Sequence, residues 1–274
     1  MADLQEESAQ IRAIDVHGHY GAYRRDDASE LDCAFMSGEP AAAVARARRA
    51  GIEVTFVSPL AGLLPRGRGE PVAANEEAAR VVAATPGLWQ WVIVHPGQPE
   101  TFAQARRLVG MPRCAGLKIH PEEHRYPITE HGAALLSLAA ELGAVVLAHS
   151  GEALSLPEDY VPLADQFPQV RLILAHLGNG ARPDLQVRAI RAARHGNLYA
   201  DTSSARSLTP GLIEWAVAQV GAERLLFGTD TPLYFAASQR ARIDQAELTL
   251  AQRRHILRDN AVALFGLPTP DPGA

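Results

Sequence analysis

Two histidines, His17 and His19, stand one residue apart near the start of the chain. They close a short run in which the apolar residues Ile14 and Val16 alternate with polar ones, as expected for a β-strand, and alternate residues of a strand point to the same face. Two imidazoles on one rigid strand suit zinc and similar divalent ions. Taken alone, the pair also fits ordinary surface or capping histidines, so other residues must decide.

Further polar side chains recur where later strands are expected to end. They are Ser58, His95, His120, His149, His176, Asp201 and Asp230, and from His95 onward the intervals are 25, 29, 27, 25 and 29 residues. Such a regular step, with one polar residue at each carboxyl end, is typical of a barrel that directs side chains to one mouth. A nucleotide-binding open sheet would instead carry a glycine-rich turn after its first strand, and the sequence has none there.

Apolar runs and helix patterns predict the elements that hold these residues. Strands are expected at 13–19, 52–58, 89–95, 115–120, 144–149, 171–176, 198–201 and 224–230. Helices are expected at 40–50, from Asn75 as a capping residue, and at 99–109, 132–142, 158–167, 184–195, 210–220 and 245–265, with a long loop over 20–40. Strands that are apolar throughout indicate a parallel sheet covered on both faces. We therefore predict an α/β fold, a (β/α)8 TIM barrel, as one domain over 1–274 with its core at about 11–267 and a disordered tail at 268–274.

Composition narrows the kinds of partner. Hydrophobic residues make up 47% and charged residues 21% of the 274 residues, and a net charge of -5 offers no broad basic surface for nucleic acid or anionic lipid. No apolar run reaches about 18 residues, and residues 1–10 do not resemble a signal peptide, so we expect no membrane contact. The two cysteines, Cys33 and Cys114, suit a reducing compartment. We expect a cytoplasmic protein that acts on a small molecule.

Six short motifs together resemble the amidohydrolase superfamily, and most closely its amidohydrolase 2 branch. They are DVHGHYG at 15–21, GLKIHP at 116–121, AHSG at 148–151, AHLG at 175–178, GTDTP at 228–232 and NAVALFG at 260–266, within a resemblance that covers 14–266. The resemblance implies one divalent ion, most often zinc although manganese or another ion also fits, bound by His17, His19, His149 and Asp230. It places His176 beside the metal-bound water or the substrate, so His176 and Asp230 are the expected catalytic residues. Homodimers are also common in this branch.

Lys118 and His120 occupy alternate positions of one predicted strand, so both should face the barrel interior. We expect Lys118 to anchor a substrate carboxylate, although related two-metal members of the superfamily use a carboxylated lysine on this strand as a bridge. His120 is expected to bind substrate, and the roles of extra ligand, proton carrier and wall residue stay open for it. Arg206 is expected either to meet an anionic substrate or to form an ordinary loop salt bridge. His95 is a weaker candidate for the mouth, and the histidines expected at the surface are His124, His131, His195 and His255.

The resemblance implies a metal-dependent hydrolase that attacks an ester, lactone or amide of a small acidic molecule with an activated water. The same branch also contains enzymes that remove carbon dioxide from aromatic or unsaturated acids without oxidation, and both reactions need the same ligands. A barrel that keeps its metal for structure alone is a third alternative. The extra lysine and histidine expected in the lumen argue against that alternative, and the fold itself cannot choose a substrate.

Overall fold

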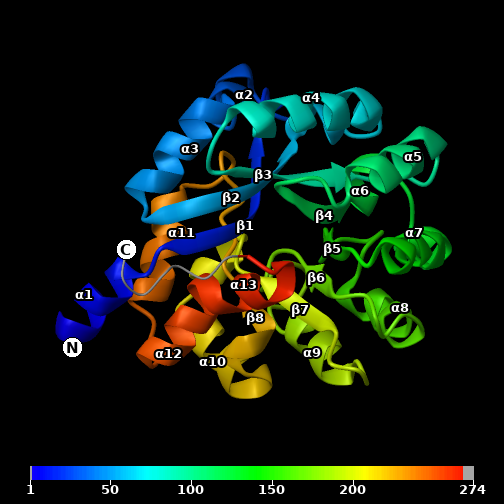
Figure 1. Cartoon of the computed structure of the whole chain (residues 1–274). Helices are drawn as coiled ribbons and strands as arrows, with labels where there is room; N and C mark the ends of the chain where they lie inside the picture. Colours follow the sequence, from blue (N-terminus) through cyan, green and yellow to red (C-terminus); the bar gives the residue numbers. More distant parts are fainter. Residues whose placement is uncertain (1, 268–274) are drawn as a thin grey trace.

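The computed structural model describes residues 2–267, with side chains described from residue 5. Its strands form one parallel sheet in chain order: β1 Ala13–Tyr20, β2 Ile52–Pro59, β3 Leu88–Ile93, β4 Cys114–Ile119, β5 Val145–Ala148, β6 Leu172–Leu174, β7 Leu198–Asp201 and β8 Leu225–Leu226. Each strand pairs with the next, and a parallel bridge between Gly18 and Thr231 joins β1 to the segment after β8. The predicted (β/α)8 TIM barrel is therefore confirmed (Figure 1). The tail predicted at 268–274 lies outside the described residues.

Helices surround the strands, and in Figure 1 α13 crosses the near end of the barrel. The described helices are α1 Ala2–Gln10, α2 Glu30–Phe35, α3 Pro40–Arg49, α4 Pro71–Ala84, α5 Pro99–Leu108, α6 Pro121–His124, α7 Ile128–Leu142, α8 Tyr160–Gln166, α9 Leu185–Ala192, α10 Leu212–Val220, α11 Ala236–Asp244, α12 Leu250–Arg254 and α13 Asn260–Phe265. None of these helices combines the length and the apolar character that crossing a bilayer requires.

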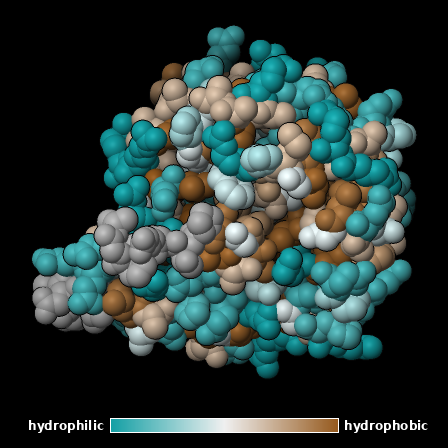
Figure 2. Space-filling model, viewed as in Figure 1, coloured by the Kyte–Doolittle hydropathy of each residue, from teal (hydrophilic) through white to brown (hydrophobic). Residues whose placement is uncertain are grey.

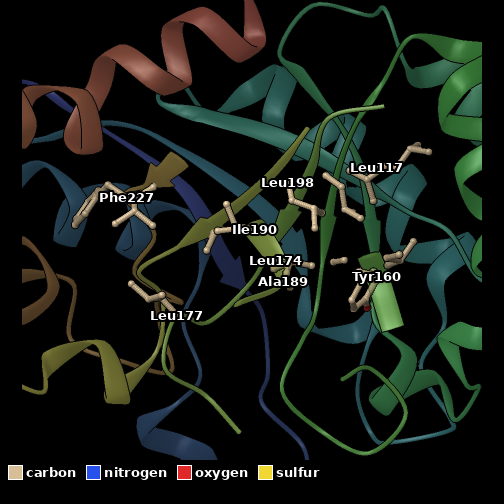
Figure 3. Packing of buried hydrophobic residues seen from close by; sticks show 14 of the residues in the cluster. Leu117, Tyr160, Leu174, Leu177, Ala189, Ile190, Leu198 and Phe227 are labelled. Atoms are coloured by element: carbon tan, nitrogen blue, oxygen red, sulfur yellow. The ribbon is translucent and has the colours of Figure 1, made fainter. Parts of the chain in front are cut away.

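The apolar core has two layers, because every strand is covered on both faces. The outer layer lies between strands and helices, where Leu174 and Leu198 pack near Ala189 of α9 (Figure 3). The inner layer fills the barrel and includes Trp91 and Phe265, whose rings meet edge to face at 5.6 Å. On the face of the molecule seen in Figure 2, hydrophobic residues gather toward the middle and hydrophilic ones toward the outer helices. With this end of the barrel packed by side chains, polar groups can converge only at the opposite mouth.

A buried carboxylate ties the first strand to the last. Asp15 accepts hydrogen bonds from the backbone of His17 at 3.1 Å, from the backbone of Thr229 at 3.0 Å and from the Thr229 hydroxyl at 2.6 Å. Burial raises the pKa of Asp15 to about 8, and the three hydrogen bonds only partly oppose that rise. The contact fixes His17 relative to the segment that carries Asp230.

Several predicted boundaries are wrong for physical reasons. Helix α4 begins at Pro71, so Asn75 lies inside it and does not cap it; its buried amide instead bonds both backbone groups of Ile93 at 2.8 Å. The predicted loop over 20–40 contains α2, a helix of six residues, none of them buried, which is too short to show a helical apolar period. The helix predicted at 245–265 consists of α12, a π-helical turn at 255–259 and α13, and α11 was not predicted.

Candidate metal centre

His17 and His19 lie on β1 with their rings 5.3 Å apart, and both side chains are buried. Each ring uses its Nδ1 atom for a fixed contact: His17 Nδ1 lies 2.8 Å from Asp201 Oδ2, and His19 Nδ1 lies 2.9 Å from the Ser58 carbonyl oxygen. Both partners can only accept, so the proton of each ring sits on Nδ1. Both Nε2 atoms are therefore unprotonated, with Lys118 Nζ 3.0 Å from that of His17. This is the tautomer that partners outside the coordination shell impose on metal-binding histidines.

Asp230 completes a compact group of donors. Its Oδ1 atom lies 3.1 Å from His19 Nε2 and 3.6 Å from His17 Nε2, and one ligand atom from each of the three residues falls within 4.8 Å of the others. Burial alone would raise the pKa of Asp230, but the neighbouring imidazoles of His19, His17 and His176 hold it at about 2. Its φ of 56° lies in the left-handed region, a strained conformation that is common at functional sites. Nitrogen and carboxylate donors in this arrangement suit a divalent cation.

His149 follows β5 and supplies an imidazole whose two nitrogens are both buried without a hydrogen-bond partner. Its backbone carbonyl accepts the Tyr160 hydroxyl at 2.7 Å, and its ring stacks on His120 with the centroids 4.0 Å apart. A buried imidazole without a partner loses its hydrogen bonds to water and gains none in return. A metal ion beside the three donors would satisfy it, so the residues present fit a divalent cation. His149 itself does not belong to the group of donors within 4.8 Å.

A second group, His17, His176 and Asp201, also has ligand atoms within 4.8 Å of one another. His176 follows β6 with a φ of 71°, and its backbone N–H donates to Asp201 Oδ1 at 2.9 Å. Burial lowers the pKa of His176 to about 4, which keeps the imidazole neutral at pH 7. Ser203 Oγ lies 2.9 Å from Nδ1 of both His17 and His176. The strand-end pattern predicts the position of Asp201 but no role for it, and Ser203 is not among the predicted site residues.

Lys118 points into the barrel as predicted, and it contacts His17 on the Nε2 side of the ring. Its Nζ atom is 3.0 Å from His17 Nε2, the side chain is fully buried, and burial lowers the pKa of the amine to about 8. Lys118 is not among the residues found to line the cavity described below, and neither is Arg206, which is exposed on the turn 205–208. The structure therefore brings neither of these two predicted substrate-binding residues to the cavity wall. His120 does reach the wall, and burial lowers its pKa.

The donors open into a cavity of about 210 Å³ at the mouth of the barrel. Its described lining consists of His17, His19, Tyr23, Arg25, Leu60, Leu63, Leu64, His120, Glu123, His149, Glu152, His176, Asn179, Ser204, Asp230, Leu233 and Tyr234. Arg25 is already paired with Asp27 at 2.8 Å and with Glu123 at 2.9 Å. The wall thus combines apolar and phenolic side chains on one part with the cluster of histidines on another, a lining suited to a small molecule with one polar end.

The surface position expected for His124 is wrong. The residue is 6% exposed. It lies on the short helix α6 against the segment that follows β2, where His124 Nε2 is 3.0 Å from the Gly62 carbonyl oxygen. Burial lowers the pKa of this imidazole to about 4. His195 is exposed as expected, whereas His131 and His255 are half-buried. His95 is also half-buried, and its ring lies tilted against that of His124 with the centroids 4.6 Å apart, outside the cavity lining.

Comparison with known proteins agrees with this architecture. A family model described as Amidohydrolase matches residues 14–267. The chain is similar in fold to a 2,6-dihydroxybenzoate decarboxylase from Rhizobium, with 14% identity, a TM-score of 0.72 and coverage of 93% of this chain and 98% of that chain. It is also similar to a 5-carboxyvanillate decarboxylase from Novosphingobium aromaticivorans complexed with manganese and 4-hydroxy-3-methoxy-5-nitrobenzoic acid, with 13% identity, a TM-score of 0.72 and coverage of 94% and 97%.

A third similar structure is an amidohydrolase II protein, with 16% identity, a TM-score of 0.66 and coverage of 93% of this chain and 100% of that chain. No curated protein matches the chain by sequence. The family model spans nearly the whole chain, and five of the six motifs behind the predicted resemblance place a histidine or Asp230 in the cavity lining; the sixth forms α13 at the opposite end of the barrel. The chain therefore belongs to the amidohydrolase family, as a TIM-barrel enzyme with a buried histidine and aspartate site for a divalent metal.

Proposed function

We propose that the protein is a metal-dependent decarboxylase that removes carbon dioxide from a small aromatic carboxylic acid without oxidation. The observation that carries the proposal is the buried group of His17, His19 and Asp230 at one end of a small cavity with Leu60, Leu63 and Tyr234 in its wall. An aromatic acid has one anionic end for the cation and one flat apolar ring for such a wall. The two decarboxylases of similar fold support the same choice.

In this proposal His17 and His19 through Nε2, Asp230 through a carboxylate oxygen, and His149 through its unpartnered ring hold one divalent ion. The ion would act as a Lewis acid toward the carboxylate and a neighbouring oxygen of the substrate. Two elements remain candidates, since nitrogen and carboxylate donors accept both zinc and manganese and one relative of similar fold is complexed with manganese. Asp201 and Ser58 contribute by holding the two Nδ1 atoms of His17 and His19.

His176 is the proposed proton carrier. Its ring lines the cavity while Nδ1 is held by Ser203, so Nε2 is the nitrogen that faces a substrate. In the reaction, Nε2 takes up a proton and delivers it to the ring carbon that carries the carboxylate. The bond between that carbon and the carboxylate breaks, carbon dioxide leaves, and the electron pair of the broken bond forms the new C–H bond with the delivered proton. Asp230, which also borders the cavity, is the second candidate for this transfer.

Two of the three expected substrate-binding residues, Lys118 and Arg206, change in this proposal. His120 is kept as a ring that stacks on His149 and borders the cavity. Lys118 Nζ contacts His17 Nε2, the nitrogen assigned to the metal, and Lys118 is absent from the cavity wall, so we propose that it tunes the donor group and does not anchor a substrate carboxylate. Arg206 is left out of the proposal because its exposed side chain is not in the cavity wall.

Hydrolysis of an ester, lactone or amide is the second candidate. It uses the same donors, and His176 would then accept the proton of the attacking water. One relative of similar fold, named amidohydrolase II, favours keeping it.

The experiment that separates the two is a parallel screen of the purified protein, stripped of metal and then loaded with zinc or manganese. Hydroxylated benzoic acids would be tested for release of carbon dioxide, and esters, lactones and amides for hydrolysis. The proposal expects carbon dioxide release that requires metal. Metal-dependent hydrolysis without carbon dioxide release would favour the second candidate, and inactivity of the metal-loaded protein toward both sets would favour a barrel that keeps metal for structure.

A further inference from the structure

Ser203 stands at the junction of the two groups of donors. The residue follows β7, is fully buried, and its Oγ atom lies 2.9 Å from His17 Nδ1 and 2.9 Å from His176 Nδ1. The same hydroxyl also makes a short hydrogen bond to Asp201 Oδ1. We infer that Ser203 is a positioning residue that holds the proton of His176 on Nδ1 and so leaves the Nε2 lone pair free toward the cavity. This inference rests on the proposed function only in giving His176 the proton transfer.

His17 limits where the Ser203 proton can go, because the proton of His17 is already assigned. Asp201 Oδ2, at 2.8 Å from His17 Nδ1, can only accept, so His17 Nδ1 carries the proton. Lys118 Nζ, at 3.0 Å from His17 Nε2, is a donor, which agrees with a bare Nε2. Ser203 therefore has no acceptor in His17, and its single hydroxyl proton goes either to Asp201 or to His176.

The carboxylate is the stronger acceptor of the two. A hydrogen bond to an ionised oxygen is about twice as strong as one between neutral groups, and the Ser203 hydroxyl donates to Asp201 Oδ1. With its proton on Asp201, Ser203 Oγ has only lone pairs to offer His176. His176 Nδ1 must then be the donor in their 2.9 Å contact, and a neutral imidazole with its proton on Nδ1 has none on Nε2.

The backbone holds this arrangement in place. Asp201 Oδ1 accepts the backbone N–H of His176 at 2.9 Å and that of Ser203 at 3.0 Å, so one carboxylate fixes both partners. His176 keeps a left-handed φ of 71° in spite of its bulky side chain, a strain that the surrounding contacts must hold. With Nδ1 of His176 bound to Ser203, only Nε2 is available for chemistry, and the Nε2 lone pair can accept a proton directly.

The tautomer can be measured without a substrate. We would label the histidines of the full-length protein with ¹⁵N, load it with zinc, which is diamagnetic, and record long-range ¹H–¹⁵N correlation spectra, with His176→Asn to assign the signals. Wild type is expected to show His176 protonated at Nδ1. Ser203→Ala should move the proton to Nε2 for a substantial fraction of molecules, because the acceptor is gone, whereas Ser203→Thr keeps a hydroxyl and should keep the wild-type pattern.

A His176 protonated at Nε2 in wild type would overturn the inference, and so would an unchanged tautomer in Ser203→Ala. If Ser203→Ala does not fold, the wild-type spectrum and Ser203→Thr still decide the matter. The result is distinct from that of the activity screen: the expected tautomer without carbon dioxide release would contradict the proposed reaction and leave the role of Ser203 standing.

Discussion

Asp201→Asn should weaken metal binding while the barrel stays folded. The asparagine side chain has an NH₂ group in place of one carboxylate oxygen, and both oxygen positions of Asp201 face hydrogen-bond donors. Turned toward His17, its NH₂ group meets the Nδ1–H that the carboxylate now accepts at 2.8 Å. Turned the other way, it meets the backbone N–H groups of His176 and Ser203. The first orientation creates one repulsive contact. The second creates two with backbone N–H groups and also removes the acceptor of the Ser203 hydroxyl, so we expect the side chain to face His17 with its NH₂ group.

The size of the effect follows from that choice. His17 must either lose its partner or move its proton to Nε2, where the proton blocks the lone pair that we assign to the metal. Loss of such an outer partner typically weakens metal affinity by about 10–100-fold, or about 1.4–2.7 kcal/mol. Because Asp201 is fully buried and water cannot replace it, we expect about 100-fold.

The assay is a competition titration of zinc against a coloured chelator, with thermal unfolding to check that the barrel is intact. The matched control is Glu141→Gln, which makes the same acid-to-amide change in a half-exposed pair with Arg106 far from the site. That control should bind zinc as wild type does, since exposed pairs contribute little. A zinc Kd for Asp201→Asn within about twofold of wild type would refute the reasoning.

Four further changes test other parts of the account. His17→Ala with His19→Ala should remove the roughly one equivalent of metal found in wild type, together with the rise in Tm on adding zinc; stoichiometric metal in the double variant would contradict the ligand assignment. His176→Asn should keep most of the metal but lose about 100-fold in activity, and parallel loss of metal would make it a ligand. Lys118→Ala should still bind about one equivalent of metal, and added bicarbonate should not change activity. If wild type instead binds two ions and Lys118→Ala loses one of them, Lys118 is a metal ligand. Gly116→Ala should lower the free energy of unfolding by about 3 kcal/mol, because its Cβ would lie 2.2 Å from the Val145 carbonyl oxygen; an unchanged urea midpoint would argue against this close strand packing.

The regular step of polar residues at strand ends was enough to predict the barrel and to select its mouth. His17, His19 and Asp230 end parallel strands or the segment after one, so the topology alone brings them together. The amphipathic helices were found for the same reason, since their periodicity is local. Helix α2 was not predicted because it has no buried face. Asn75 was predicted as a helix cap because, in the sequence, an asparagine that caps a helix cannot be distinguished from one buried inside it.

Partners that lie far apart in sequence were harder to find. Asp201 lies 184 residues from His17, and only the closed barrel shows that its carboxylate meets His17 Nδ1. Ser203 belongs to a polar run after β7 that also fits an ordinary loop. Strand alternation correctly predicted that Lys118 points inward. It cannot distinguish a side chain that reaches the cavity from one that ends against a neighbouring ring, as Lys118 does against His17.

The most direct test of the account is to locate the metal itself. Crystals of the manganese-loaded protein, measured at a wavelength where manganese scatters anomalously, would show its position in a difference map. We predict one peak in contact with Nε2 of His17 and of His19, a carboxylate oxygen of Asp230 and a ring nitrogen of His149. A peak held instead by His17 Nδ1, His176 and Asp201, the other group of close donors, or the absence of any peak at the mouth of the barrel, would contradict the account.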